Sequence, residues 1–386
     1  MHCRATVITL SLFALVAAAS ARAADKPTIL RTPDRGIQPQ AVADAKGVIH
    51  LLYFKGQDSA GDLFYVRKEP GQERFSAPIR VNSQPGSAIA VGTIRGGQIA
   101  LGKNGRVHVA WNGSGAAMPR SAGKSSPMLY ARLDDDSKAF EPQRNLITQT
   151  YQLDGGGTVA ADDKGNVYVA WHGPRFNPNA SAPPGEANRQ VWLAHSTDDG
   201  KTFARETAVN RATGACGCCG MKAFADSKGV LYMLYRSATA GVNRDMYLLT
   251  SKDKGKTFQS VLVQRWNVNG CPMSSEAFAE GPKGTLAAWE TQGLIYFSPV
   301  TRIAKPQAVP GTRGKCKHPA IAQNAKGETL LVWTEDTGWN KGGSLVWQVF
   351  GTNGRPTGER GRVDGGAPVW GLPTAVATPD GFVLIH

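Results

Sequence analysis

One phrase recurs along the whole chain, and it restricts the possible folds more than any other feature. A short apolar strand leads into a turn with a glycine and then into a second alternating strand, as in AVADAKGVIHLLYF, TVAADDKGNVYVAW and AFADSKGVLYMLYR. This pattern is typical of a β-hairpin. The turn glycines of the seven copies are Gly47, Gly105, Gly165, Gly229, Gly284, Gly327 and Gly381. Their spacing of about 40 to 65 residues fits a repeat architecture.

Two more strand-like runs follow each of the first six hairpins, for example QVWLAHS and ARETAVN after the third. A four-stranded unit of this size cannot bury both faces alone, so the units must pack against one another. The 45 glycines and 23 prolines agree with many tight turns. The sequence predicts an all-β fold, a β-propeller of four-stranded antiparallel blades, as one domain over residues 24–386.

The number of blades follows from the last hairpin, which has only two strands before His386. The segment PTILRTP near residue 30 can supply a further strand, and a last blade closed by N- and C-terminal strands would leave no free edge in the ring. Seven blades follow from the hairpin count. Six blades remain if the last hairpin packs elsewhere.

The first 23 residues have the pattern of a secretory signal peptide. His2 and Arg4 precede the apolar run ATVITLSLFALVAAA, and the small residues of ARA precede Ala24. Cys3 lies ahead of this run rather than at the cleavage point, so it is not a lipid attachment site. We expect an exported protein, periplasmic or secreted, that does not span the membrane.

The formal net charge of +14 favours anionic partners. The basic residues are scattered, without a run of five and without interleaved aromatic residues. Specific nucleic-acid binding is therefore not expected.

Two units carry a sharper motif, STDDGKTF at 196–203 and SKDKGKTF at 251–258. It resembles the Asp box of the sialidase-like superfamily, also described as neuraminidase or BNR repeats. LDDDSKAF at 133–140 is a degenerate copy that keeps Asp135 and Phe140. The resemblance covers residues 24–386 and implies a propeller with the boxes on the face opposite the active site. We expect structural roles for Ser196, Asp198, Gly200, Thr202, Phe203, Ser251, Asp253, Gly255, Thr257 and Phe258.

The resemblance also implies how a sialidase would work, with three arginines on the substrate carboxylate, a Tyr and Glu nucleophile pair and an Asp acid/base. The first of these arginines lies in an R-I-P motif, but the aligned segment here is GIQPQAVAD, with Ile37 in the arginine's place. Sialidase activity is not expected. The alternative hypothesis is an exo-glycosidase with a diverged active site, for which Asp154 and Glu276 are the candidate acids.

The opposite face carries two long loops, which begin at Asn112 and His172. Loops of this length often shape a binding site. An aromatic residue ends the second strand of each of the first six units, and a set this regular predicts core positions: Tyr53, Trp111, Trp171, Tyr235, Trp289 and Trp333.

Cysteine is concentrated at the starts of three consecutive units. Cys216, Cys218 and Cys219 precede the first strand of the fourth unit, Cys271 that of the fifth and Cys316 that of the sixth. First strands of neighbouring blades line the propeller axis, so we expect these thiols to converge there, with Met221, Met273 and His318 beside them.

Three hypotheses can explain such a cluster. Exported cysteines often form disulfides, here between blades. Thiolate, thioether and imidazole ligands suit a soft or borderline metal ion, copper as Cu(I) or zinc. The adjacent Cys218 and Cys219 suit thiol exchange. The sequence therefore predicts a binding or accessory protein that takes a small ligand, a metal or a glycan at its axial face.

Overall fold

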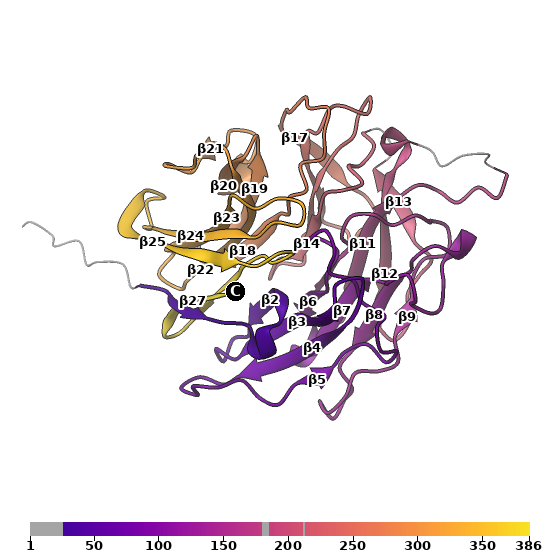
Figure 1. Ribbon diagram of the computed structural model, residues 1–386, viewed down its shortest axis with the longest axis horizontal. Coiled ribbons are helices and arrows are strands. Elements are labelled where there is room, and N and C mark those ends of the chain that lie inside the picture. The colour runs from indigo at the N-terminus through magenta and orange to yellow at the C-terminus, as the bar shows by residue number, and fades with distance from the viewer. Residues whose placement is uncertain (1–25, 180–184, 211–212) are drawn as a thin grey trace, which may run out of the picture.

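The computed structural model describes residues 26–179, 185–210 and 213–386. The predicted signal peptide, residues 1–23, lies outside the described residues. Six four-stranded antiparallel sheets and one three-stranded sheet form a ring of seven blades (Figure 1). The predicted propeller is confirmed, with seven blades.

The blades follow the chain in order, and each starts with the strand nearest the axis. The first three consist of β2 (Ile37–Ala43), β3 (Ile49–Gln57), β4 (Ala60–Lys68) and β5 (Ile79–Arg80); β6 (Gln98–Leu101), β7 (Val107–Asn112), β8 (Met128–Arg132) and β9 (Arg144–Asn145); and β10 (Thr158–Ala161), β11 (Val167–Gly173), β12 (Gln190–Ser196) and β13 (Thr207–Asn210).

The next three consist of β14 (Met221–Ala225), β15 (Leu231–Arg236), β16 (Met246–Ser251) and β17 (Gln259–Gln264); β18 (Ala277–Gly281), β19 (Gly284–Thr291), β20 (Leu294–Pro299) and β21 (Gln307–Ala308); and β22 (Cys316–Gln323), β23 (Thr329–Glu335), β24 (Gly343–Phe350) and β25 (Pro356–Ala367). Five short 3-10 helices lie in the connections: η1 (Pro33–Arg35), η2 (Lys103–Gly105), η3 (Ala122–Lys124), η4 (Glu186–Asn188) and η5 (Val300–Arg302).

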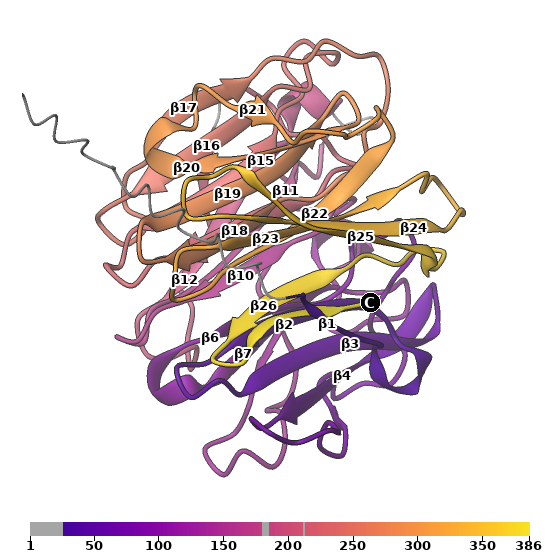
Figure 2. The same cartoon turned by 90° about the vertical axis from the view of Figure 1, so that its left-hand side faces the viewer.

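The seventh blade joins the two ends of the described chain. Its hairpin, β26 (Thr374–Thr378) and β27 (Gly381–Ile385), pairs through β27 with β1 (Thr28–Leu30). The β1 strand runs parallel to β27, with Ile29 opposite Leu384. Figure 2 shows β26 and β27 beside β1 and β2. The predicted closure by N- and C-terminal strands is confirmed, although this blade has three strands.

The hairpin turns explain the conserved form of the repeated phrase within this chain. All seven turn glycines have positive φ, which L-residues with a side chain seldom adopt. In four turns an acidic or amide side chain directly after the first strand accepts backbone N–H bonds from the residues two and four positions on. These acceptors are Asp44, Asp162, Asp226 and Asn324.

The hydrophobic core is divided into seven clusters, one between each pair of neighbouring blades. The aromatic residues singled out in the second strands lie within these strands rather than at their last positions, and they are almost fully buried, as the sequence predicts: Tyr53, Trp111, Trp171, Tyr235, Trp289 and Trp333. Each blade is therefore stabilised by both neighbours, which is how a ring of small sheets obtains a sufficient core.

Both Asp boxes are self-contained turns between the third and fourth strands of a blade. The hydroxyl of Ser196 donates to Asp198 (2.7 Å), and the amide and hydroxyl of Thr202 donate to the same carboxylate (2.9 and 2.6 Å). Phe203 packs against the core between the second and third blades. Ser251, Asp253, Thr257 and Phe258 repeat the arrangement one blade later.

The degenerate third box uses a different acid from the one predicted. Asp134, rather than Asp135, accepts backbone N–H bonds from Lys138 and Ala139 (2.8 and 3.2 Å). Asp135 forms an ion pair with Arg106 instead. Phe140 keeps its expected role and packs edge-on against Tyr65.

Among the described residues, no helix has the length and apolar character needed to cross a membrane.

Candidate functional site

Three cysteines gather in the loop between β13 and β14, at the end of the axis where the inner strands begin. The Sγ atom of Cys216 lies 3.0 Å from that of Cys219 and 3.5 Å from that of Cys218. All three sulfurs lie within 4.8 Å of one another. Cys216 and Cys219 are buried, and Cys218 is partly exposed. We call these three residues the sulfur cluster.

The loop that carries the sulfur cluster is held by three neighbouring segments. Its backbone N–H groups donate to the carbonyl of Arg236, the carbonyl of Ser274 and the carboxylate of Glu186; the donors are Cys216 (2.9 Å), Gly220 (2.9 Å) and Gly217 (2.7 Å). The side chain of His172 contacts the carbonyl of Cys219 through Nε2 (3.0 Å). The positions of the sulfurs are thus fixed by contacts from the third, fourth and fifth blades.

One glycine permits this close packing. A Cβ atom on Gly155 would lie 2.1 Å from the carbonyl oxygen of Cys219 and 2.6 Å from Nε2 of His172. Any side chain at position 155 would therefore displace the cysteine loop.

Several arginines surround the sulfur cluster, each paired with an acid. Arg95 pairs with Asp154, and Arg244 with Glu186. Arg236 is completely buried, lies 3.6 Å from Glu290 and stacks over Trp266 at 4.9 Å. Buried charges of this kind are stable only when they are paired or hydrogen-bonded. Of these arginines, Arg236 favours ionisation of Cys219 and Arg244 favours that of Cys216.

The electrostatic environment distinguishes the three thiols. Burial opposes ionisation of Cys219, but hydrogen bonds from Cys216 and Cys218, together with Arg236, hold its pKa well below the usual value. The pKa of Cys218 is raised by its hydrogen bonds to Cys216 and Cys219 and by burial. At Cys216 the hydrogen bond to Cys218 lowers the pKa, but the bond to Cys219 and burial raise it by more. The pKa of Cys216 is therefore also raised. Cys219 is thus the thiolate that the other two thiols stabilise.

The expectation that Cys271 and Cys316 join the sulfur cluster at the axis is wrong. Cys271 is exposed. Cys316 is buried in the core cluster between the fifth and sixth blades, with its sulfur 3.8 Å from Glu335. The register of β22 against β23 shifts between Lys317 and Ala320, so the first residues of β22 do not continue the inward pattern of the rest. No disulfide is present among the described residues.

The other predicted ligands are divided between the core and the axial face. Met221 packs in the core cluster between the third and fourth blades. Met273, at a positive φ of 48°, and His318 line a small cavity beside the axis. His318 is buried, its Nδ1 lies 3.3 Å from the hydroxyl of Ser275, and burial lowers its pKa to about 3. His318 is therefore a neutral imidazole at physiological pH.

The two candidate acids of the glycosidase hypothesis differ in their surroundings. Asp154 accepts from the guanidinium of Arg95, which also contacts its backbone carbonyl. Glu276 is buried, and neither of its carboxylate oxygens has a hydrogen-bond partner among the described residues. Burial raises the pKa of Glu276 well above its ordinary value, an effect that Arg236 opposes and Cys219 and Glu290 reinforce.

The sequence did not single out the residues that support the cluster. Glu186 lies in the second of the two long loops, and this loop length was the one signal that pointed to it. Nothing in the local pattern marked Glu290 or Arg244, because their contacts join segments far apart in the chain. Ile37 begins β2, where it pairs with Phe54 and packs against the first core cluster, so the inner strand of the first blade opens with an apolar residue.

Comparison with known proteins gives a fold and no family. No protein-family model matches the sequence, and neither does any curated protein. A protein of unknown function from Dyadobacter fermentans DSM 18053 is similar in structure, with a TM-score of 0.54 at 16% identity over 87% of this chain and 96% of that one. The Hadza microbial sialidase Hz136 gives a TM-score of 0.51 at 12% identity over 83% of this chain and 69% of its own. The architecture is thus that of a sialidase-like propeller.

Proposed function

We propose that this sialidase-like propeller is an exported binding protein that holds a soft metal ion, Cu(I) above all, on Cys216, Cys218 and Cys219. The observation that carries the proposal is the mutual distance of the three sulfurs, all within 4.8 Å. A metal with Zn–S-like bonds of about 2.3 Å brings its thiolate ligands to separations of this order. Three sulfurs at that spacing can share one ion.

The number of donors favours copper over zinc. Structural zinc sites take four ligands in a tetrahedron, whereas soft thiolates alone suit Cu(I). Among the described residues, no imidazole or carboxylate joins the three sulfurs within the same distance. The donor set is therefore all-sulfur and of low coordination number.

The charge around the cluster supports the same proposal. Three thiolates and one Cu(I) carry a net negative charge, and an unpaired charge of that kind is costly to bury. Arg236 helps to lower the pKa of Cys219, and Arg244 opposes the rise of the Cys216 pKa. The backbone contacts of the loop fix the donors in advance, which reduces the ordering that binding requires.

Export is proposed from the N-terminal segment alone. Residues 1–23 have a basic start, an apolar run and small residues at the cleavage position, which together are typical of a signal for export.

The test is anaerobic titration of the reduced protein with Cu(I) in competition with bicinchoninate. We expect about one tightly held ion per chain, and a clearly lower affinity in Cys219→Ser, because that variant keeps only two of the three sulfur donors. Cys271→Ser is the matched control, since it removes an exposed thiol outside the cluster. Equal loss of copper in both variants, or preferential retention of zinc in the wild type, would contradict the proposal. A disulfide between Cys216 and Cys219 that persists in reductant would contradict it as well.

A second candidate is a glycosidase with a diverged site, and one observation favours it. The raised pKa of Glu276 is the condition expected of a general acid at neutral pH. Its carboxyl group is buried, however, whereas a general acid must reach the leaving group within hydrogen-bonding distance. We expect no turnover of aryl sialosides between about pH 4 and 8. Turnover that disappears in Glu276→Gln would favour the glycosidase.

A further inference from the structure

The axis of the propeller contains a cavity of about 370 Å³ that the sulfur cluster does not use. It is lined by all seven inner strands, from β2 round to β26. Its volume is within the range of pockets that hold small molecules. Cys216, Cys218 and Cys219 are not among the residues that line this cavity.

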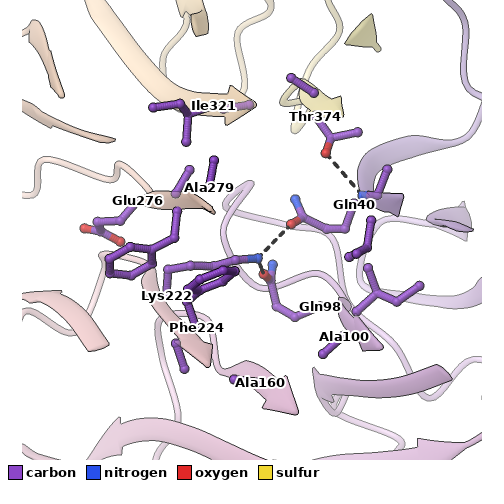
Figure 3. Close-up of a pocket in the computed structure, with 18 of the residues that line it drawn as sticks. Gln40, Gln98, Ala100, Ala160, Lys222, Phe224, Glu276, Ala279, Ile321 and Thr374 are labelled. Atoms are coloured by element: carbon purple, nitrogen blue, oxygen red, sulfur yellow. Dashed lines mark hydrogen bonds between the residues drawn. The ribbon is translucent and has the colours of Figure 1, made fainter. Parts of the chain in front are cut away.

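One basic side chain enters the cavity. Lys222, the second residue of β14, donates from Nζ to the side-chain oxygens of Gln98 (2.7 Å) and Gln40 (3.3 Å), as Figure 3 shows. Both partners are neutral amides. An ammonium group carries three donors, so a third N–H remains for another acceptor.

No carboxylate of the described chain compensates this charge. The acids that line the cavity are Glu276 and Glu280, and neither forms an ion pair with Lys222 within the described residues. Glu280 instead accepts from the amide and hydroxyl of Ser227 (2.9 and 2.6 Å). An enclosed cation without a counter-ion is unfavourable, and a bound anion relieves this cost.

A second donor lies beside the ammonium group. The oxygen of Gln98 is taken by Lys222, and no hydrogen bond of its amide nitrogen is found among the described residues. The amide of Gln40, in contrast, donates to the carbonyl of Pro39 (3.0 Å). Lys222 and Gln98 together can therefore donate to both oxygens of one carboxylate.

Part of the remaining wall is apolar, although Glu276, Glu280, Gln323 and Thr374 also line it. Small or hydrophobic side chains from five inner strands face the space beyond the polar group (Figure 3): Ala100, Ala160, Phe224, Ala279 and Ile321. A ligand with one anionic end and an aliphatic remainder would match this division.

The cavity has one closed end and one open end. Near the starts of the inner strands the lining is buried, as for Glu276 and Leu372, and Gln38 closes the axis by donating to the carbonyls of Ala90 and Trp370 (2.6 and 2.9 Å). Near the strand ends the lining is partly exposed, as for Leu101 and Ala377. Lys222 lies toward the closed end, so the anionic group of a ligand would lie deepest.

We propose that this cavity binds a short aliphatic carboxylate, with its carboxylate on Lys222 and Gln98 and its carbon chain directed toward the open end. The ligand enters from the face opposite the sulfur cluster.

Calorimetric titration of the full chain with butyrate tests the proposal. We expect one site per chain, with butan-1-ol and nitrate both binding at least about tenfold more weakly, since each lacks one of the two features. Equal binding of butan-1-ol would show that the ammonium group is not used. Equal binding of nitrate would show that the apolar wall is not used, and absence of butyrate binding would overturn the proposal outright.

Two variants locate the site. Lys222→Met keeps most of the length of the side chain and removes the charge, so butyrate binding should fall by about tenfold or more. Lys228→Met is the matched control, because Lys228 is an exposed residue of the turn that follows β14. Gln98→Glu provides an internal carboxylate for Lys222 and should abolish binding in a stably folded protein. Undiminished binding in either cavity variant would refute the assignment.

The pH dependence offers an independent measurement. Burial lowers the pKa of Lys222 to about 8. Only the protonated amine attracts an anion, so affinity should decline as the pH rises through about 8. The other titratable side chains that line the cavity are Glu276 and Glu280. An affinity that stays constant across this range in the wild type would contradict a role for the ammonium group.

Discussion

At the scale of single residues, the Asp boxes show how a charge can act entirely within its own turn. Burial opposes ionisation of Asp198, but the bonds that it accepts from Thr202 and Ser196 together outweigh this effect and lower its pKa to about 2. Every donor lies within four residues of the acid. This carboxylate is therefore satisfied locally and has no group left for a ligand.

The lowered pKa of Asp198 predicts a dependence of stability on pH. An unfolded aspartate titrates near pH 3.9, so the stabilisation is fully present above about pH 4 and is lost as the pH falls through about 2. Asp198→Asn should lower the melting temperature by a few degrees at neutral pH, with the difference from wild type vanishing near pH 2. Thermal melts across this range check it, with the exposed Asp163→Asn as control. A difference of constant size down to pH 2 would show that the charge is not involved.

At the scale of elements, the long connection between β11 and β12 is the main support of the sulfur cluster. Its residue Glu186 accepts from the amide of Gly217 and also pairs with Arg244. This connection therefore links the third blade to the cysteine loop and to the loop after β15. Residues that orient metal ligands in this way strongly affect affinity.

Removing this support should weaken metal binding without removing a ligand. In Glu186→Ala we expect Cu(I) affinity to fall by about tenfold while the stoichiometry stays at one. The Cu(I) affinity of Glu186→Gln should lie between those of the wild type and Glu186→Ala. Its side-chain oxygen can still accept from the amide of Gly217, but the ion pair with Arg244 is lost. Competition titrations of the three proteins would measure this order. Affinities that do not differ would show that the connection has no part in holding the cluster.

The sequence predicted those elements whose causes are local. The seven glycine turns, the boxes at Asp198 and Asp253 and the buried aromatic residues all depend on patterns within a few positions, and all are found where expected. Cys316 was misplaced because a register shift inside β22 depends on packing between blades, which the alternating pattern does not record. Lys222 occupies an ordinary inward position of MKAFA, and only the assembled ring shows that no acid of the described residues pairs with it.

At the scale of the whole molecule, the three-residue strand β1 closes the ring. Ile29 packs against the core between the sixth and seventh blades, and Leu30 against the core between the seventh and the first. Thr32 and His386 extend the pairing by one backbone bond of 2.7 Å. Without β1, the outer edge of β27 would be unpaired, and such edges promote association.

The closure can be tested with charges at the two partly buried positions of β1. The double variant Ile29→Asp/Leu30→Asp should lower the melting temperature by several degrees and increase self-association, since it opens the ring and exposes β27. Thr28→Asp, on the exposed position of the same strand, is the control. Calorimetry and size-exclusion chromatography read out both effects. A double variant that melts like the control and stays monodisperse would show that the ring holds without its closure.

The pairing of β1 with β27 also sets an order of events during folding. Neighbouring blades are neighbours in sequence, so the five core clusters between the first six blades can form before the last hairpin is made. The remaining contact joins residues 28–30 to residues 383–385 and must wait until the last strand is available. Contacts of such long sequence separation form slowly. We therefore expect the ring to close last, so that the chain stays an open arc, which can still be threaded through a pore, until β1 pairs with β27.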